Sequence, residues 1–243
     1  MDRSSIVSVY LDLSHDEYSV NMITARNLYD ICIEIELDRS VRCVIISGTG
    51  KNYFCVGIGT ELSNNPSPWS KLSSSIAELT VPVIAAINGN ASDAGLEIIL
   101  ACDIRIAADN ACFGFPGILE GKLPFNGGTQ RLPRIVGKGH AMELLLTGEL
   151  INATQAIQIG LVDEVVPLSR LMKRTVELAG MISGKAPVAV RFAKEAVNAS
   201  SNLPLSEGLR LEGDLYLLLQ TTRDRSEGVS AFLNKRKPMF HGD

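Results

Sequence analysis

The sequence predicts an α/β protein in which pairs of strands alternate with helices and a helical region follows. Short apolar runs closed by turn signals recur between stretches with helical spacing through the first part of the chain. From Leu168 onwards the pattern is helical, with breaks at 184–187 and 202–204. The recurring strand–strand–helix order indicates a spiral of related units. We therefore expect a core over residues 1–184 and a C-terminal helical region over residues 185–243.

The order of the expected elements follows from local patterns. Apolar or alternating runs predict strands at 6–11, 42–47, 53–59, 81–87, 104–107 and 161–166. Apolar residues at helical spacing predict helices at 21–37, 69–79, 96–102, 128–136, 139–146 and 152–160. Gly137 and Gly139 break one of these helical stretches, and Gly160 ends another. Polar or small residues at 63–68 and 90–95 predict loops.

Composition limits the classes of protein to which the chain can belong. Its 243 residues, 46% of them hydrophobic, suffice for one large domain or a domain with an appendage. A net charge of −4 argues against nucleic acid as a partner, and no apolar stretch reaches the ~20 residues of a membrane span. The histidines are not spaced as metal ligands, and the five cysteines form no CxxC pair. We expect a cytoplasmic protein with reduced, buried cysteines, no metal, no nucleic-acid partner and no membrane segment.

The stretch 86–128 carries the best candidate for a functional site. A strand ends at the turn signal Asn88–Gly89, a loop of small residues follows, and a buried helix begins near Leu96. Backbone N–H groups at the start of a helix can point at developing negative charge. Glu97 lies in the first turn of this helix, among apolar residues where a carboxylate needs a functional reason. The arrangement predicts a site for an anion, with Glu97 beside it.

Motifs spread over nearly the whole chain resemble the enoyl-CoA hydratase/isomerase (crotonase) family. Residues 54–59 are similar to the F-S-A-G-A-D loop of that family, and residues 82–103 to its A-x-x-G…E-x-x-x-x-C-D pattern. Residues 113–162, which include the sequence GGTQRL at 127–132, and the tail at 231–240 continue the resemblance in the same order. The resemblance implies a crotonase-like ββα superhelical spiral core with a C-terminal helical trimerisation region, and therefore a homotrimer or a hexamer.

The same resemblance implies a chemistry for the predicted anion site. Members of the family act on acyl-CoA thioesters, with coenzyme A as part of the substrate and no bound cofactor. Two backbone N–H groups stabilise the thioester enolate, and by position these belong to Ile58 and Ala94. Backbone donors aimed at a developing oxyanion are worth ~3–4 kcal/mol each. An acyl-carrier-protein thioester stays open as an alternative substrate.

The carboxylates of the resembling hydratases are only partly present in this sequence. One family glutamate is retained as Glu97, whereas Gly117 stands in place of the second. Glu120 lies close enough to contribute an accessory carboxylate, although a surface position is the interpretation that we favour. Asp93 replaces a family glycine, and either supplies a new acid beside the thioester or caps the following helix. We expect it to cap the helix, as Asp often does near an N-terminus.

Substrate-binding residues follow from the resemblance position by position. Cys55 and Val56 would line the loop around the adenine, and Gly57, Gly95 and Gly117 would lie along the substrate. In the family, a phenylalanine and a lysine of the C-terminal tail reach the CoA site of a neighbouring subunit. In this sequence these residues are Phe232 and Lys235.

Three functions stay open at this point. The retained Glu97 favours an enoyl-CoA hydratase-like lyase. Gly117 favours an acyl-CoA decarboxylase, since members resembling methylmalonyl-CoA decarboxylase also lack the second glutamate. Phe125 stands where those members have a tyrosine, and it has no hydroxyl group to take over a tyrosine role. The altered loop at Asp93 also leaves room for a catalytically weak member that binds acyl-CoA.

Overall fold

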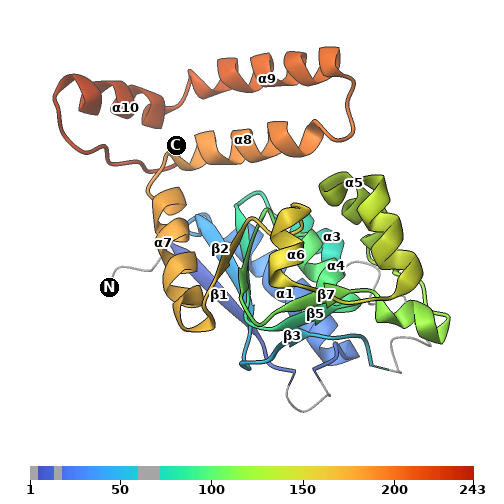
Figure 1. The fold of residues 1–243 in the computed structure, drawn as a ribbon. Helices are drawn as coiled ribbons and strands as arrows, with labels where there is room; N and C mark the ends of the chain where they lie inside the picture. Colours follow the sequence, from blue (N-terminus) through green and yellow to red (C-terminus); the bar gives the residue numbers. More distant parts are fainter. Residues whose placement is uncertain (1–4, 14–17, 60–71) are drawn as a thin grey trace.

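Two sheets form the centre of the computed structural model, which describes residues 5–13, 18–59 and 72–243 (Figure 1). The larger sheet is parallel and runs in the order β1 (Ile6–Leu11), β2 (Cys43–Gly48), β4 (Val83–Ile87), β6 (Ile104–Ala108) and β9 (Glu164–Val166). The smaller sheet contains β3 (Tyr53–Cys55), β5 (Asn90–Ser92), β7 (Cys112–Gly114) and β8 (Ile151–Asn152). Only β8 runs antiparallel to its neighbour among these described strands.

The chain alternates between the two sheets and then enters a helix. Strands β2, β4 and β6 of the larger sheet are followed by β3, β5 and β7 of the smaller one. Helices α3 (Leu72–Ala77) and α4 (Ala94–Leu100) follow the first two pairs. A 3₁₀ helix η2 (Pro116–Glu120) and α5 (Gly128–Thr147) follow the third. These repeated strand–strand–helix turns confirm the predicted α/β spiral.

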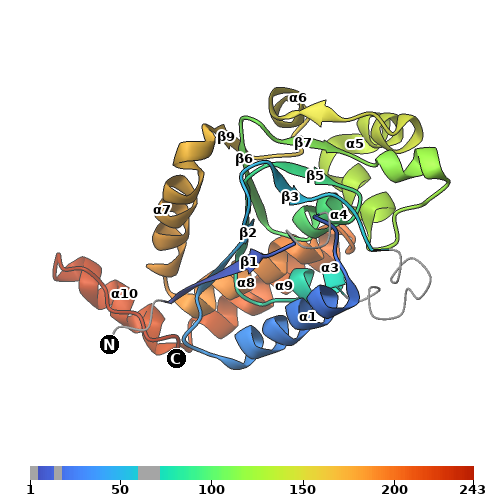
Figure 2. The same cartoon turned by 90° about the horizontal axis from the view of Figure 1, so that it is seen from below.

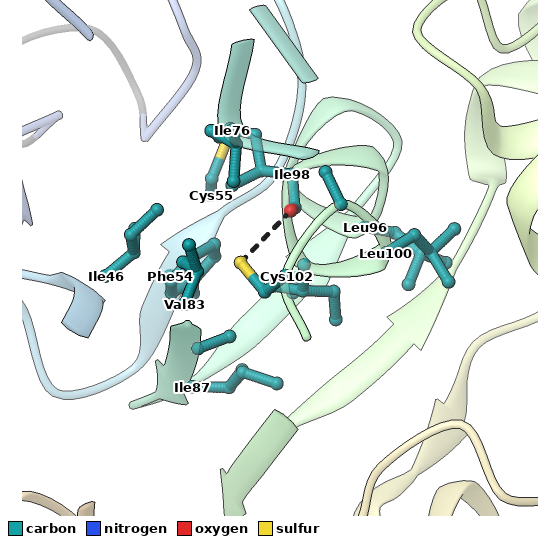
Figure 3. Close-up of a cluster of buried hydrophobic side chains, with 14 of the residues drawn as sticks. Ile46, Phe54, Cys55, Ile76, Val83, Ile87, Leu96, Ile98, Leu100 and Cys102 are labelled. Atoms are coloured by element: carbon teal, nitrogen blue, oxygen red, sulfur yellow. Dashed lines mark hydrogen bonds between the residues drawn. The ribbon is translucent and has the colours of Figure 1, made fainter. Parts of the chain in front are cut away.

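The hydrophobic core lies on both faces of the parallel sheet. In β2, Val44 and Ile46 face the cluster under α1 (Met22–Leu37), α3 and α4, whereas Cys43 and Ile45 face α7 (Leu171–Ser183). Figure 2 shows α7 on one side of the sheet and α1 with α3 on the other. Such burial on both faces explains the near-continuous apolar strands of the sequence. The inner cluster, with Phe54 from β3, is drawn in Figure 3.

The C-terminal helices form a separate layer on the core. After α6 (Ala153–Gln158), η3 (Leu168–Arg170) and α7, helices α8 (Pro187–Ala199) and α9 (Leu205–Leu219) run side by side, and α10 (Arg223–Leu233) follows (Figure 1). Lys194 Nζ of α8 donates to Asp103 Oδ2 at 2.6 Å and to the carbonyl of Val81 at 2.9 Å. Arg42 donates to the carbonyls of Ser183 and Phe240. These polar contacts attach the layer to the sheet.

Several local predictions are confirmed and others are wrong. The helix over 128–147 bends at Gly137, whose φ of 79° is not helical, and the turn at Asn88–Gly89 follows β4 as expected. Residues 90–92 of the predicted loop form β5, because β3 and β7 on either side take up its backbone hydrogen bonds. The strand predicted at 161–166 is limited to β9, because Leu161 donates to Ala156 at the end of α6. The loop predicted at 63–68 and the first part of the helix predicted at 69–79 lie outside the described residues.

Candidate active site

Two loops that leave the smaller sheet form the base of the site. Parallel pairing aligns Cys55 of β3 with Ala91 of β5, and Ile58 and Ala94 each come three residues later in the chain. The backbone after β5 packs directly against the end of β3. A Cβ placed on Gly95 would lie only 1.9 Å from the carbonyl oxygen of Cys55. The sequence therefore needs glycine at 95 for the two loops to meet.

The N–H groups of Ile58 and Ala94 make no hydrogen bond to any part of the chain that the structure describes. Val20 donates to the carbonyl of Gly57 at 3.0 Å and accepts from the N–H of Gly59 at 2.9 Å, which makes a parallel bridge opposite Ile58. In such a bridge the N–H of the middle residue points away from the partner chain. Ala94 is the first residue of α4, where an N–H has no partner within the helix. No described residue accepts a hydrogen bond from either N–H.

The Glu97 carboxylate is buried on the first turn of α4, with a side chain only 3% exposed. Its Oε1 accepts the backbone N–H groups of Asn126 at 2.5 Å and Gly128 at 2.9 Å. Burial raises the pKa of Glu97 to about 7, against the opposing effect of these two hydrogen bonds. The charge of Asp93 raises this pKa further, and that of Arg131 lowers it. Glu97 can therefore both accept and release a proton near neutral pH.

Asp93 does not cap α4, so that prediction is wrong. The residue occupies the N-cap position, with a φ of 47° and a ψ of −112°, but its side chain accepts no N–H of the helix. Its Oδ1 accepts the N–H of Gly117 at 3.0 Å instead, because the backbone turn points the carboxylate towards η2. Burial raises the pKa of Asp93, while the Gly117 N–H and Lys122 lower it.

Gly117 and Glu120 lie on η2, opposite Asp93. Gly117 is buried, and a Cβ placed on it would lie 2.9 Å from Asp93 Oδ1. Glu120 is exposed, and its Oε2 pairs with Lys122 Nζ at 2.6 Å. The preferred interpretation of Glu120, a surface glutamate, is confirmed.

Comparison with known proteins gives this geometry a context. The family model for enoyl-CoA hydratase/isomerase matches residues 2–243. The chain belongs to the enoyl-CoA hydratase/isomerase family. It is 37% identical to a crotonyl-CoA hydratase of Syntrophomonas wolfei over 98% of this chain and 95% of that protein. It is also 37% identical to a 2,3-dehydroadipyl-CoA hydratase of Escherichia coli, over 92% of this chain and 94% of that protein.

Solved structures of this enoyl-CoA hydratase/isomerase family share the fold. The crystal structure of an enoyl-CoA hydratase from Bacillus anthracis matches with a TM-score of 0.92 at 37% sequence identity, covering 97% of this chain and 96% of that one. This confirms the predicted crotonase fold. It also confirms the family that the motifs of the sequence indicate.

The remaining predicted residues of this family member lie in two places. Cys55 is buried at the end of β3, and burial raises the pKa of its thiol to about 12, so the thiol stays protonated. Val56 and Gly57 follow it and are half-buried. Phe232, 83% exposed, lies in the last turn of α10 and Lys235 follows two residues after the end of this helix. Figures 1 and 2 show α10 well apart from α4. Within one chain these two residues do not meet Glu97.

Sequence reasoning missed the residues that surround the Glu97 carboxylate. Asn126 and Gly128 supply its two donors, and Arg131 Nη1 donates to the carbonyl of Asn126 at 2.7 Å. The pair Gly127–Gly128 at the start of α5 was the signal in the sequence that could have indicated these donors, since Gly127 adopts a φ of 104°. A cavity of about 1330 Å³ borders this segment and extends to α7 and α8; its lining includes Phe125, Asn126, Arg131 and Lys194.

Two further findings concern metals and membranes. Within 5–13, 18–59 and 72–243, no group of three His, Cys, Asp or Glu side chains is arranged to hold a metal ion. Among the helices that the structure describes, none is long and apolar enough to cross a bilayer.

Proposed function

We propose that this protein hydrates an α,β-unsaturated acyl-CoA thioester, with Glu97 as its acid–base group and the N–H groups of Ile58 and Ala94 as its oxyanion hole. The observation that carries the proposal is the buried Glu97 carboxyl, with a pKa of about 7, in the same helical turn as Ala94. A proton-transfer group works best with a pKa near the operating pH. The two donors come from neighbouring loops and have no partner among the described residues.

The proposed reaction uses these groups in one site. The thioester oxygen accepts the N–H groups of Ile58 and Ala94, which makes the β-carbon electrophilic. Glu97 takes a proton from water, and the water oxygen forms a bond to the β-carbon. The electron pair of the carbon–carbon double bond moves into the enolate, whose charge the two N–H groups stabilise by ~3–4 kcal/mol each. A second proton then bonds to the α-carbon and Glu97 releases the proton that it took to solvent, so that one water is added in total.

Relatives support the substrate class and leave the acyl group open. Proteins similar to this one are named as hydratases of crotonyl-CoA and of 2,3-dehydroadipyl-CoA. We propose a CoA thioester, with coenzyme A as part of the substrate and no further cofactor; an acyl-carrier-protein thioester is the alternative. The five cysteines are free, as is usual in the reducing cytoplasm, which is the location that we propose.

Phe232 and Lys235 support a proposed quaternary structure. Phe232 lies in the last turn of α10 and Lys235 just beyond it, where they could complete the CoA site of a neighbouring subunit in a trimer or a hexamer. The outward faces of α9 and α10 carry exposed apolar side chains that a neighbouring subunit would cover: Leu205, Leu209, Tyr216, Leu217, Leu218, Phe232 and Leu233. Such a set is unusual on a monomer.

A panel of thioesters tests the proposed activity. Crotonyl-CoA and longer enoyl-CoA substrates should gain the mass of one water with the natural protein. Glu97→Gln should lower the rate by about 10²-fold or more, because the amide cannot accept the proton. Asp30→Asn, a change in an exposed carboxylate on α1, is the matched control and should keep the natural rate.

Decarboxylation is the second candidate, and Gly117 favours it. Loss of CO₂ generates the enolate directly, so the reaction needs the oxyanion hole but no second carboxylate. Release of CO₂ from malonyl-type thioesters, without hydration of any enoyl-CoA, would replace the hydratase proposal. Thermal stabilisation by acyl-CoA without any turnover would instead indicate a protein that only binds the thioester.

A further inference from the structure

We propose that Asp93 is a second catalytic carboxyl group of this site, in the space that Gly117 leaves open. The inference rests on the proposed hydration and adds the group that supplies the proton to the α-carbon. Four features support it: the close approach of Asp93 to Gly117, the backbone conformation of Asp93, its position beside Ala94, and a side-chain oxygen to which no described residue donates.

The Asp93 carboxylate lies in the space that a side chain at position 117 would enter. A Cβ on Gly117 would lie 2.9 Å from Asp93 Oδ1 and 3.3 Å from its Cγ. Any side chain at 117 would therefore require the Asp93 carboxylate to shift. A carboxylate can reach this space from residue 93 or from residue 117. In this chain residue 93 supplies it.

The backbone at Asp93 is strained, although its side chain does not cap α4. A φ of 47° with a ψ of −112° is a conformation that glycine adopts readily and an L-residue does not. The side chain makes no hydrogen bond to α4, whose N-terminus has no other side-chain cap. Backbone strain of this kind clusters at functional sites.

Asp93 lies next to the proposed oxyanion hole. It directly precedes Ala94, and its carbonyl accepts the N–H of Glu97 at 3.0 Å. Oδ1 is fixed by the N–H of Gly117, while no described residue donates to Oδ2. Among the described residues, the charged or titratable groups that interact electrostatically with this carboxyl are Glu97, Glu120, Lys122 and the Cys55 thiol. Burial raises the pKa of Asp93 and so favours its protonated form, as does the charge of Glu120, whereas the Gly117 N–H and Lys122 oppose this effect.

The proton balance gives the two carboxyl groups complementary roles. As the water oxygen bonds to the β-carbon, Glu97 takes the water proton. Asp93 Oδ2–H gives its proton to the α-carbon, where the enolate electron pair forms the new C–H bond. Glu97 then loses its proton and Asp93 regains one through solvent, so the enzyme returns to its starting state with one water added.

Exchanging the carboxylate between the two positions tests the inference. Asp93→Asn keeps an oxygen for the Gly117 N–H but removes the acid, and should lower the hydration rate by about 10²-fold. Asp93→Gly should lower the hydration rate by the same factor, because it also removes the acid. The double variant Asp93→Gly with Gly117→Glu should regain a rate within about tenfold of the natural protein, because the carboxyl returns from the other side of the same space. Asp30→Asn is the unchanged control.

The outcomes separate this inference from the proposed function. Asp93→Asn and Asp93→Gly proteins that melt like the natural protein and hydrate within about threefold of it would overturn the role of Asp93 alone, provided that Glu97→Gln is inactive. If a single variant fails to fold, the double variant decides. A double variant that folds but does not recover activity would also overturn the role of Asp93. A natural protein that hydrates no enoyl-CoA would remove both proposals.

Discussion

At the scale of single residues, the site is dominated by a carboxyl group in an unfavourable place. Glu97 is flanked by apolar residues along α4, and burial makes its ionised form costly. Two backbone donors offset only part of this cost, so its pKa is about 7. The pKa of this group in the unfolded chain is ~4.3. Between that pH and about pH 7, Glu97 therefore keeps its proton in the folded chain and has lost it in the unfolded chain.

The stability of the protein should depend on pH through Glu97. Because its folded pKa is raised, the contribution of this group is fully present below pH ~4 and is lost as pH rises through about 7. Glu97→Gln keeps the acceptor oxygen without the charge. The free energy of unfolding of the variant minus that of the natural protein should be more favourable to the variant at pH 8 than at pH 4, by on the order of 2–3 kcal/mol. Urea unfolding at both pH values measures this, and an equal difference at pH 4 and pH 8 would contradict it.

The hydration rate should follow the ionisation of the same group. Glu97 must be ionised to take a proton from water and Asp93 must be protonated to supply one, so kcat/KM at low substrate should pass through a maximum as pH increases, with one limb near pH 7. A pH–rate profile of the natural protein on crotonyl-CoA measures this. A rate that stays flat between pH 5 and pH 9 would argue against Glu97 as the base.

At the scale of elements, the site depends on how closely α4 approaches β3. Residue 95 lies against the carbonyl of Cys55, at a distance that leaves no room for a side chain. This approach fixes the start of α4, and with it the Ala94 N–H, beside the loop that carries Ile58. The packing of α4 and the geometry of the proposed oxyanion hole are therefore the same feature.

A methyl group added at position 95 should disturb both the packing of α4 and the proposed oxyanion hole. Gly95→Ala forces the backbone of α4 and β3 apart, and we expect a loss of ~3 kcal/mol in the free energy of unfolding, together with most of the activity. Gly180→Ala in α7 is the matched control, because nothing lies within 4 Å of its added methyl group. That variant should gain ~0.5–1 kcal/mol. Thermal unfolding of both proteins, with rates on crotonyl-CoA, checks this, and equal effects at the two positions would contradict it.

The elements also explain what could be predicted from the sequence. Strands of the parallel sheet are buried on both faces, so their apolar runs could be predicted from the sequence, as could the break at Gly137. Strand β5 could not be predicted, because its three small residues show no alternation of apolar and polar side chains and form a strand only by pairing with β3 and β7. Asp93 was misjudged because its partner Gly117 lies 24 residues away and its positive φ redirects the side chain. The partners of Glu97, 29 and 31 residues away, were missed for the same reason.

At the scale of the whole molecule, the C-terminal layer carries the proposed subunit contacts. We expect light scattering after gel filtration to give the mass of three or six chains of 26.2 kDa. Leu217→Asp on α9, where the side chain is 65% exposed, should shift the protein towards smaller species, because a charge in an apolar contact is costly. Leu37→Asp at the end of α1, at 77% exposure, is the control and should not. A natural protein that elutes as a single chain would contradict the proposal.

The strand order of the larger sheet has a consequence for how the chain is synthesised. Each strand pairs with the one that precedes it in that sheet, from β1 to β9, so no strand has to insert between two that are already paired. The sheet can therefore grow at a single edge while the chain emerges from the ribosome. Its outer face, which includes Cys43, Ile45 and Ile84, is covered only when α7 arrives. Until residue 183 has emerged, the nascent chain exposes that apolar face, and this interval is when it most needs a chaperone.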